Sequence, residues 1–388
     1  MNILHITTFL QGGAGKVIKD IAFHQKHNGS NVYILTSKSH EPGYCNYEEY
    51  LDEFNEMGIF VFLIDSTFKR DLYLNLNVVS KLKEIIKKYN IDIIHAHAAI
   101  PGMIGIIARA GIDNGYVPVI QTMHGWGTNK RVEHEEVDIT IMNSLDQIIA
   151  VSGSDKKLMI DKGVEPSKII TIYNGIEKEN SNEKNDELIE ELKLKKKQGF
   201  NIIGCIGTIC RRKNQQIIIN ALKDINTKQK LFCVFIGEGD MLEALENEVK
   251  QYKLEEKIKF YGYRNNASKY LKYFDFFILP SLSEGFSIGI LEAFREKVPV
   301  ICSNISTFKE IIEDEFTGYL FENDDVKSLR EIILKVLNKN YQEKDIIIKN
   351  AYNKFCERFT IDKMFLKYDE TYLCQNEIFQ KNIVKNIH

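Results

Sequence analysis

Short apolar runs of strand character alternate with helical patterns along most of this 388-residue chain. Runs without polar alternation are typical of strands that are buried on both faces of a parallel sheet. They occupy residues 3–6, 32–35, 59–64, 91–97, 117–124 and 147–152, and then 201–207, 231–236, 258–260 and 276–279. The pattern predicts an α/β fold of doubly wound parallel sheets, in which ligands bind beyond the carboxyl ends of the strands.

A polar interval divides this alternation into two halves. Residues 177–198 are rich in charge, and the same order of elements starts again after them. The lysine run 195–197 stands beside glutamates, which favours a solvated helix face over a surface for nucleic acid or membrane. We therefore predict two Rossmann-like domains, 1–176 and 177–360, followed by a terminal helix at 361–388.

One strand–turn–helix unit carries the densest set of candidate binding groups. The apolar run 276–279 leads through a Ser/Gly turn into a helical pattern that extends to Phe294. The first N–H groups of such a helix point into the turn, where the helix dipole favours an anion. Glu284 lies in the turn, and Glu292 follows about two turns later near the same face. The unit offers amides for a diphosphate and carboxylates for sugar hydroxyls, unless both glutamates are simply surface residues.

The surroundings of these two glutamates resemble a known family. They stand in the sequence Leu-Pro-Ser-Leu-Ser-Glu-Gly-Phe at 279–286, with Ala293 and then Pro299-Val300 beyond. This context resembles retaining family-4 glycosyltransferases (glycosyl transferases group 1) of the GT-B fold, and the resemblance covers nearly the whole chain. It implies two domains that face each other across a cleft, the first for the acceptor and the second for the donor. It also implies that the helix at 361–388 crosses back to the first domain.

The resemblance further implies an activity. A hexose or N-acetylhexosamine would pass, with retained configuration, from a UDP-linked donor to a hydroxyl of a glycan, a lipid-linked or a small-molecule acceptor. The product would belong to surface polysaccharide or glycoconjugate biosynthesis. Two alternatives stay open: a nucleotide-sugar epimerase of the same fold, and a non-catalytic GT-B-like binding subunit.

The donor residues are assigned by the same resemblance. Glu284 would contact donor-sugar hydroxyls and Glu292 the ribose, while the backbone at Ser287 and Ile288 would bind the distal phosphate. The nucleotide base would be held near Tyr263 and Arg264. The predicted donor set is Gly13, Arg212, Lys213, Tyr263, Arg264, Glu284, Gly285, Phe286, Ser287, Ile288 and Glu292.

Lys213 lies just past a predicted strand, where a cation would neutralise a departing diphosphate. It matches the lysine that the family has in this loop. Thr208 stands where the family usually has an arginine, so we expect Arg211 or Arg212 to supply the second cation. Exposed loop cations without a ligand are the alternative, and Thr208 favours the non-catalytic subunit. Retention of Lys213 with Glu284, Glu292 and His124 argues against it.

The first half of the chain supplies the acceptor-side candidates. Gly12-Gly13 follows the first strand and matches a family Gly-Gly pair near the donor phosphate and the acceptor, although a plain tight turn has the same sequence. His124 ends a strand, and an imidazole that titrates near neutrality can donate or accept a proton at a reacting oxygen. A structural histidine is the alternative. His97 and Trp126 complete the acceptor-side set, and the predicted catalytic residues are His124, Glu284 and Lys213.

Composition argues against several other classes. A net charge of −3 gives no basic field for nucleic acid, and seven scattered Cys with no Cys-x-x-Cys suit a reducing cytoplasm. Since no Asp-x-Asp follows a strand, we predict no metal, and no cofactor besides the nucleotide-sugar co-substrate. The chain starts with a strand and has no run of ~20 apolar residues.

We therefore expect a cytoplasmic protein of unspecified oligomeric state. Lys81, Lys83, Lys87 and Lys88 accompany Ile85 and Ile86 in one helical pattern. Such a basic amphipathic helix could bring the protein to the inner face of a membrane, and an ordinary surface helix is the alternative.

One further position departs from the family. Lys297 replaces the glycine that mostly ends the helix there. A left-handed backbone at this point would cost a non-glycine residue roughly 1 kcal/mol.

Overall fold

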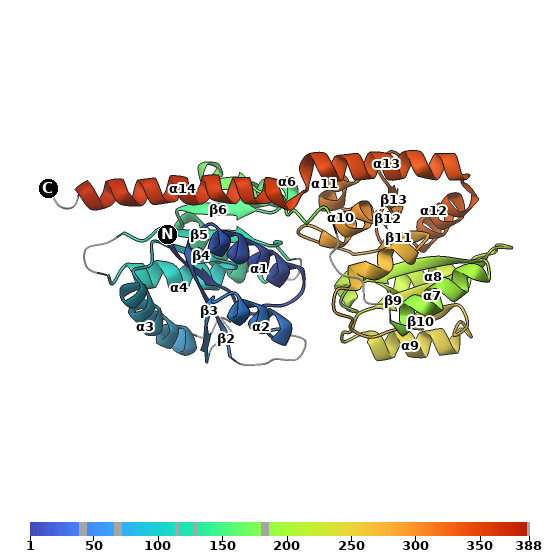
Figure 1. Cartoon of the computed structure of the whole chain (residues 1–388), viewed down its shortest axis with the longest axis horizontal. Coiled ribbons are helices and arrows are strands. Elements are labelled where there is room, and N and C mark those ends of the chain that lie inside the picture. Colours follow the sequence, from blue (N-terminus) through green and yellow to red (C-terminus); the bar gives the residue numbers. More distant parts are fainter. Residues whose placement is uncertain (39–44, 66–71, 113–115, 128–129, 180–185, 386–388) are drawn as a thin grey trace. The chain divides into compact units, whose positions relative to one another are not determined.

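The computed structural model describes residues 1–38, 45–65, 72–112, 116–127, 130–179 and 186–385, without the side chains of residues 72 and 379–385. Its contacts divide the chain into two compact units (Figure 1). Unit 1 comprises Met1–Asn174 and Asp362–His388, and unit 2 comprises Gly175–Ile361. Residues 180–185 of the charged interval and 386–388 of the terminal segment lie outside the described residues.

The described strands of unit 1 form a seven-stranded parallel sheet in the order β3–β2–β1–β4–β5–β6–β7. Their bounds are β1 Asn2–Ile6, β2 Asn31–Ser37, β3 Phe60–Ile64, β4 Ile93–Ala96, β5 Val119–Met123, β6 Gln147–Ala150 and β7 Ile169–Thr171. The chain extends the sheet from β1 in one direction and then, from β4 on, in the other. The strand order therefore reverses between β1 and β4.

Helices cover both faces of this sheet (Figure 1). Their bounds are α1 Gly12–His27, α2 Glu48–Glu56, α3 Leu72–Tyr89, α4 Ala99–Arg109, α5 Val132–Asn143, α6 Gly153–Asp161, the 3-10 turn η1 Pro166–Lys168, and α14 Ile361–Lys385. On one face, Leu4 and Ile94 pack with Leu82 of α3 and Ile104 of α4 in a buried apolar core. Because side chains alternate along a strand, the residues next to Leu4 and Ile94 point to the other face.

The run at 59–64 differs from its prediction as a buried strand. It forms β3, at the edge of the sheet, where Phe60 and Leu63 are 56% and 50% exposed. An edge strand has a neighbour on one side only and receives less helical cover. Local hydrophobicity cannot distinguish this position from a central one.

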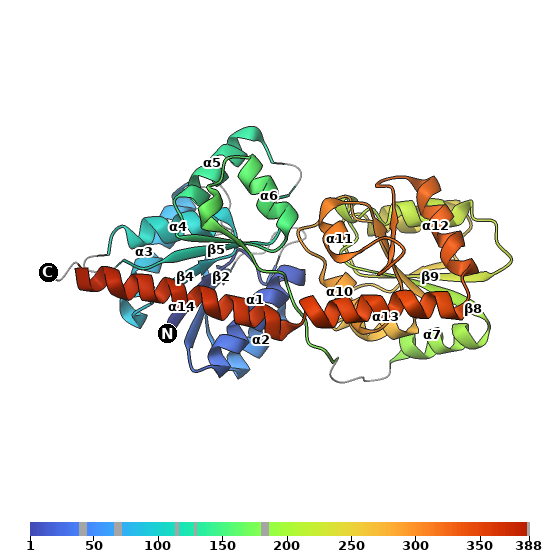
Figure 2. The same cartoon turned by 90° about the horizontal axis from the view of Figure 1, so that it is seen from above.

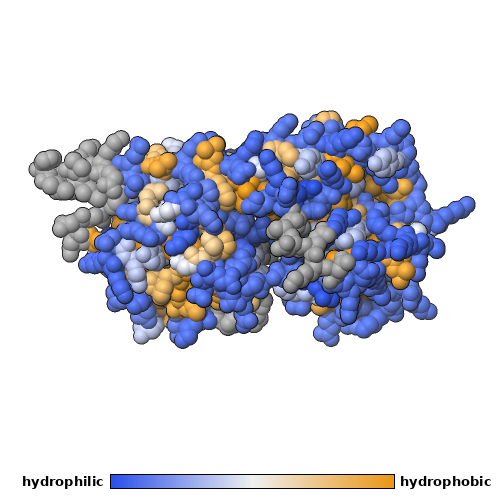
Figure 3. Space-filling model, viewed as in Figure 1, coloured by the Kyte–Doolittle hydropathy of each residue, from blue (hydrophilic) through white to orange (hydrophobic). Residues whose placement is uncertain are grey.

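The helix proposed to contact a membrane uses its apolar side inside the protein. Ile85 and Ile86 of α3 are buried in the core with Leu82. They are thus unavailable to lipid, which favours the alternative of an ordinary surface helix. In the described parts of the chain, no helix has the length and apolar character needed to cross a bilayer. On the face drawn in Figure 3, hydrophobic residues form separate patches among hydrophilic ones.

The described strands of unit 2 form a six-stranded parallel sheet in the order β10–β9–β8–β11–β12–β13. Their bounds are β8 Phe200–Ile206, β9 Lys230–Ile236, β10 Ile258–Phe260, β11 Phe276–Leu279, β12 Val300–Ser303 and β13 Tyr319–Phe321. Here the order reverses between β8 and β11. Both units are thus Rossmann-like, and the prediction of two doubly wound parallel-sheet domains is confirmed.

The helices of unit 2 follow the same alternation. Their bounds are α7 Glu187–Lys197, η2 Arg211–Lys213, α8 Gln216–Lys223, α9 Leu242–Gln251, η3 Ala267–Tyr273, α10 Ile288–Arg295, α11 Ser306–Ile311, α12 Val326–Asn338 and α13 Tyr341–Arg358. A buried core joins Ile203 and Ile278 of the central strands to Ile218 of α8 and Leu329 of α12.

The C-terminal helix α14 belongs to unit 1 (Figure 2). Its Tyr368 and Tyr372 are each 1% exposed. Near its start, the ring of Phe365 stacks on His24 of α1 with 3.9 Å between the centroids, and Asp369 accepts a 2.8 Å hydrogen bond from the same histidine. The last helix of the chain therefore covers elements formed from its first residues.

Left-handed residues end several helices of unit 2. Lys297 has φ 60°, so the conformation expected after α10 is present, and Lys253 after α9 has φ 55°. A non-glycine side chain in this region costs roughly 1–2 kcal/mol, because Cβ approaches the next carbonyl oxygen.

Lys253→Gly is expected to raise the free energy of unfolding by about 1 kcal/mol, because glycine removes this clash. The control is Lys250→Gly, three residues earlier in α9, where glycine should cost about 1 kcal/mol of helix propensity. Urea unfolding followed by circular dichroism measures both changes. Equal destabilisation by the two substitutions would contradict the interpretation.

Candidate active site

Most of the predicted donor residues of unit 2 lie in the segments that follow β8 and β11, at the reversal of its strand order. β8 leads through Gly207 into η2, and β11 leads through residues 280–287 into α10. In doubly wound sheets, the connections beyond such a reversal run to opposite sides and leave room for a ligand. Since β8 and β11 are adjacent strands, the two loops identified from sequence are neighbours.

A buried carboxylate connects these two loops. The side chain of Glu284 is 10% exposed and pairs with Lys213 (Nζ–Oε1 2.5 Å) and Arg212 (Nη1–Oε2 2.9 Å). Arg212 also donates a 2.9 Å hydrogen bond to the carbonyl of Ser283, and its own carbonyl accepts from the N–H of Leu282 at 2.8 Å. Side-chain and backbone contacts thus hold the loops in one arrangement.

Arg212 is the residue that supplies the second cation at Glu284. Its side chain is 45% exposed but forms the ion pair, and Arg211 and Thr208, at the position of the family arginine, are exposed as well. The 3-10 turn η2 brings Arg212 and Lys213 to the same carboxylate. The guanidinium therefore reaches the site from a backbone position four residues later than expected.

The charges around Glu284 decide its ionisation. Burial by itself would raise the pKa of this carboxyl, but the charges of Lys213 and Arg212 and the contact with Lys213 lower it below its usual value. Glu284 is consequently ionised at neutral pH. The trio of two cations and one carboxylate carries a net charge of +1, which favours an anionic ligand.

The predicted base-binding segment lies in a third loop, after β10. Tyr263 is 44% exposed, and its N–H donates a 3.2 Å hydrogen bond to Oε1 of Glu238, in the loop after β9. Backbone contact also joins this region to the loop after β8, since a Cβ on Gly237 would lie 2.1 Å from the carbonyl oxygen of Gly207. Glycine is therefore required at Gly237. Arg264 is exposed, and its Nε donates to the carbonyl of Tyr261 at 3.2 Å.

The remaining donor candidates surround the start of α10. Ser287 caps the helix by accepting from the N–H of Ile290, and Ile288 is the first helical residue. Gly285 and Phe286 are buried in the turn, and Glu292 is half-buried in the middle of α10. This cap confirms the strand–turn–helix geometry predicted for the segment, while the ligand roles stay predictions.

In unit 1, the acceptor-side candidates also follow the central strands. α1 begins directly at Gly12, which has φ 55°, and both Gly12 and Gly13 are exposed. His97 comes directly after β4, and His124 directly after β5. Because β1, β4 and β5 are consecutive parallel strands of the sheet, the three positions share one edge of it.

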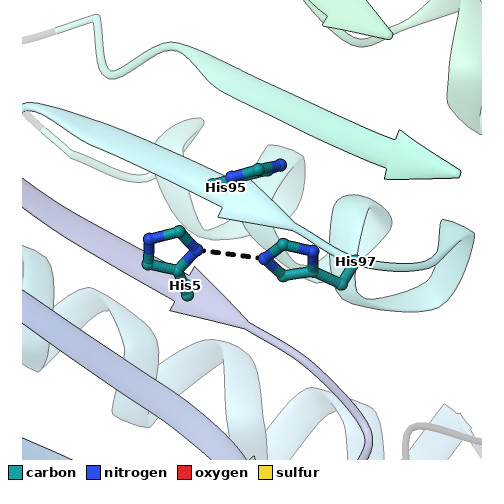
Figure 4. A group of neighbouring side chains, drawn as sticks. All are labelled: His5, His95 and His97. Carbon is teal, nitrogen blue, oxygen red and sulfur yellow. Dashed lines mark hydrogen bonds between the residues drawn. The ribbon is translucent and has the colours of Figure 1, made fainter. Parts of the chain in front are cut away.

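Both histidines belong to a hydrogen-bonded network, of which Figure 4 shows His5, His95 and His97. His5 of β1 and His95 of β4 are paired in register, and neither is exposed. Nδ1 of His5 lies 3.0 Å from Nε2 of His97, and Nδ1 of His97 lies 3.1 Å from Nε2 of His124. Gln25 of α1 continues the series, because its Oε1 lies 2.8 Å from Nε2 of His5.

His95 forms a separate branch of this network. Its Nδ1 lies 2.5 Å from the hydroxyl of Tyr372 in α14, and its Nε2 lies 2.8 Å from Oγ1 of Thr122. The same Thr122 hydroxyl lies 3.2 Å from that of Tyr368. Each ring nitrogen of His95 is thus satisfied by a hydroxyl, as buried polar groups require.

The cluster also contains the atoms needed for a metal site. Ring nitrogens of His5, His95 and His97 lie within 4.8 Å of one another, and imidazole suits zinc and copper. However, all six ring nitrogens of these residues already have hydrogen-bond partners. The contacts therefore account for the cluster as a hydrogen-bonded network.

Burial keeps these imidazoles neutral. It lowers the pKa of His5 and of His124 to about 4. Burial also lowers the pKa of His95 and His97 well below the usual value, and neighbouring histidines add to this effect. At neutral pH, each ring therefore carries one N–H and one lone pair.

Trp126 has a mainly internal environment. It is 4% exposed, and its indole N–H donates a 2.8 Å hydrogen bond to Glu135. Lys130 lies over its ring at 4.2 Å. These contacts give the residue a packing role, and its predicted contact with an acceptor stays a prediction.

His5, Gln25 and Tyr372 were not predicted from the sequence. His5 belongs to a strand recognised for its apolar residues, Gln25 lies 20 residues later in α1, and Tyr372 belongs to α14, far from both in the chain. A signal for His5 existed, since a histidine in a buried strand needs a polar partner. Nothing local identified which partner that would be.

Comparison with known proteins assigns the family. A model described as Glycosyltransferase Family 4 matches residues 11–180, and one described as Glycosyl transferases group 1 matches residues 186–354. The chain belongs to glycosyltransferase family 4. The predicted family and its GT-B fold are confirmed, and the protein is a glycosyltransferase.

Two sequence relatives and one solved structure illustrate the similarity. The glycosyltransferase is 28% identical, over 77% of its chain and 81% of the relative, to UDP-Gal:alpha-D-GlcNAc-diphosphoundecaprenol alpha-1,3-galactosyltransferase of Escherichia coli. It is 25% identical to N-acetyl-alpha-D-glucosaminyl L-malate synthase of Bacillus anthracis, over 93% of each chain. The crystal structure of Anabaena HepE in complex with UDP and glucose superposes with a TM-score of 0.79 at 19% identity, covering 96% of this chain and 99% of that one.

The neutral histidines predict that the stability of unit 1 falls with acidification. In the unfolded chain, histidines take up a proton near pH 6.5, whereas His5 and His124 in the folded protein take one up only near pH 4. Stability is therefore complete above pH 7 and is lost as the pH falls from 6.5 toward 4, by about 1 kcal/mol per pH unit for each such histidine.

Urea unfolding at pH 7.5, 6.5 and 5.5 measures this loss. Trp126 is the one tryptophan of the sequence, so its fluorescence reports on unit 1. The midpoint should fall steadily between pH 6.5 and 5.5 while changing little above pH 7. An equal midpoint at all three values would show that the folded and unfolded states bind protons equally, so that folding does not lower the pKa of these rings.

Proposed function

We propose that this glycosyltransferase is a retaining, metal-independent hexosyltransferase. It takes a hexose or an N-acetylhexosamine from a UDP-linked sugar and transfers it to a hydroxyl group. The observation that carries the proposal is the buried Glu284 with Lys213 and Arg212, at the strand reversal of unit 2. An ionised carboxylate beside two cations suits a ligand that combines a diphosphate with sugar hydroxyls.

The donor half of the proposal follows from charge. The net charge of +1 around Glu284 and the N-terminus of α10 both favour a diphosphate. As the sugar–phosphate bond breaks, negative charge grows on the leaving diphosphate, and Lys213 can stabilise it without a metal ion. Glu284 keeps the two cations in place before the donor arrives and offers its oxygens to sugar hydroxyls.

The acceptor half is assigned to unit 1. Gly12 and Gly13 expose backbone at the start of α1, and His124 lies at the same sheet edge. These groups are an imidazole and backbone amides, so the proposal invokes no covalent glycosyl–enzyme intermediate. The acceptor oxygen bonds to the anomeric carbon on the face from which the diphosphate leaves, and the hydroxyl proton passes to the diphosphate.

The acceptor class is proposed from the relatives. The Escherichia coli relative is named for a diphosphoundecaprenol-linked acceptor, and another Escherichia coli relative, 25% identical, is named an O-antigen biosynthesis glycosyltransferase. We extend this to a glycan or lipid-linked acceptor in the assembly of a surface polysaccharide or glycoconjugate. Such an acceptor would place the enzyme at the cytoplasmic face of a membrane.

Lys213→Ala and Glu292→Ala are predicted to affect different quantities, the first mainly turnover and the second mainly UDP affinity. Loss of Lys213 removes a contact that strengthens as charge develops, so kcat should fall about 100-fold or more with a smaller change in UDP affinity. Loss of Glu292 removes ribose hydrogen bonds worth roughly 1.5–3 kcal/mol each, so UDP affinity should fall at least ~10-fold. Arg211→Ala, at an exposed cation in the same turn, is the control. Calorimetry with UDP and single-turnover kinetics measure the two quantities, and unchanged UDP affinity in Glu292→Ala would remove the ribose assignment.

A transfer assay separates the proposed function from its alternatives. UDP release is measured from UDP-galactose, UDP-glucose and their N-acetyl forms, with and without an acceptor carrying a diphospholipid-linked sugar. A transferase releases UDP and forms an extended acceptor, and the proton NMR spectrum of the product should show retained configuration. Isomerised or released sugar without acceptor would indicate the epimerase, and no turnover with any donor would indicate the binding subunit. Activity lost in chelator and restored by magnesium or manganese would overturn metal independence.

A further inference from the structure

Four residues of unit 1 form a linear hydrogen-bonded series that ends at His124. From the inside outward, these are Gln25, His5, His97 and His124, joined by contacts of 2.8, 3.0 and 3.1 Å. Gln25 and His5 are 4% and 0% exposed, and His97 is 7% exposed. Only the outermost residue, His124, is half-exposed at the carboxyl end of β5.

The position of each proton in this series follows from that of its neighbour. Oε1 of Gln25 can only accept, so Nε2 of His5 must carry a hydrogen atom. The neutral His5 ring then has a lone pair on Nδ1, which requires the N–H of His97 on Nε2. By the same rule, Nδ1 of His97 accepts, and the hydrogen atom of His124 is on Nε2. The amide oxygen of Gln25 thereby determines the tautomers of all three imidazoles.

We propose that Gln25, His5 and His97 are positioning residues that hold His124 in the Nε2–H tautomer, with the lone pair of Nδ1 presented to the acceptor hydroxyl. The inference rests on the proposed role of His124 in transfer, and it adds which atom of the ring acts. Among the described residues, Nδ1 of His124 has no hydrogen-bond partner given by the structure. In this form, His124 accepts a hydrogen bond from the acceptor hydroxyl before the reaction and orients its oxygen toward the sugar, and the hydroxyl proton then passes to the diphosphate as the new bond forms.

The series also explains why polar groups occupy the interior of a sheet. A free imidazole in water exchanges its proton between both nitrogens, so a surface histidine at this position would offer a lone pair or an N–H at random. Buried rings that bond to one another exclude that exchange, because reversing one ring forces every other ring to reverse. The neutral state that burial imposes is necessary, because a doubly protonated ring would interrupt the series.

A metal ion would require a different arrangement of the same atoms. An ion bound to Nδ1 of His5 and Nε2 of His97 would displace the hydrogen atom that these two nitrogens share. It would also take one nitrogen of His95 from Tyr372 or Thr122. The hydrogen-bonded series leaves all of these contacts intact. Detection of a bound metal is therefore one of the results that would contradict it.

Nitrogen NMR of protein labelled with 15N-histidine tests the proposal directly. Two-bond correlations distinguish protonated from unprotonated ring nitrogens, and the signals that disappear in His124→Gln belong to His124. The expected result is an Nε2–H tautomer for His124 at pH 7.5. An Nδ1–H tautomer, or a stoichiometric metal detected by mass spectrometry with histidine nitrogens shifted by coordination, would overturn the proposal.

Variants at Gln25 test the origin of the effect. Gln25→Met keeps the length of the side chain without an acceptor, so His124 should populate both tautomers, and the single-turnover rate should fall at least ~10-fold with unchanged UDP affinity. Gln25→Glu restores an acceptor oxygen and should recover the Nε2–H form. His27→Gln, an exposed histidine on the same helix, is the control. An unaltered His124 tautomer in folded Gln25→Met would contradict the proposal.

The NMR measurement uses neither donor nor acceptor, so it separates this inference from the proposed function. If His124→Ala transfers sugar at the parent rate while the predicted tautomer is observed, the catalytic role of His124 fails and the hydrogen-bonded series stands. If the rate falls in His124→Ala but its tautomer is the opposite one, the function stands and the series is wrong.

Discussion

The reversal of strand order in each parallel sheet is the constraint on which the candidate site depends. Consecutive parallel strands need crossover connections, and these connections diverge where the chain changes direction along the sheet. In unit 2, the reversal lies between β8 and β11, and in unit 1 between β1 and β4. Every group assigned to donor or acceptor lies in a segment that follows the carboxyl end of a strand, either in the loop or in the helix after it. The position of the candidate residues thus follows from the topology of each sheet, before any side chain is considered.

The two units satisfy buried polar groups in opposite ways. Unit 2 buries charge, and the cost of removing Glu284 from water is offset by two cations and the hydrogen bonds that accompany them. Unit 1 buries neutral rings and satisfies both nitrogens of His5, His95 and His97 with other polar atoms. An ion trio suits the binding of a phosphate, because its charges are already in place. Neutral imidazoles suit the orientation of an uncharged hydroxyl.

Much of this arrangement was predictable from sequence. Apolar runs located the strands, and the residues around Glu284 and Glu292 indicated the family, because a strand–turn–helix unit is a local structure whose signals lie close together. The predictions failed where the answer depended on distant partners. The run at 59–64 became an exposed edge strand. Whether Arg211 or Arg212 meets Glu284 depends on one 3-10 turn, and the partners of His5 come from α1 and from His97, just after β4.

The C-terminal helix has a consequence for synthesis on the ribosome. Tyr372 covers His95 across a sequence separation of 277 residues, and α14 belongs to the unit that begins at Met1. Domains generally fold in the order in which they are translated. Here the residues of unit 2 are continuous and emerge before α14, so unit 2 can complete its core first. The N-terminal sheet can bury His95 under Tyr372 only after α14 has been translated.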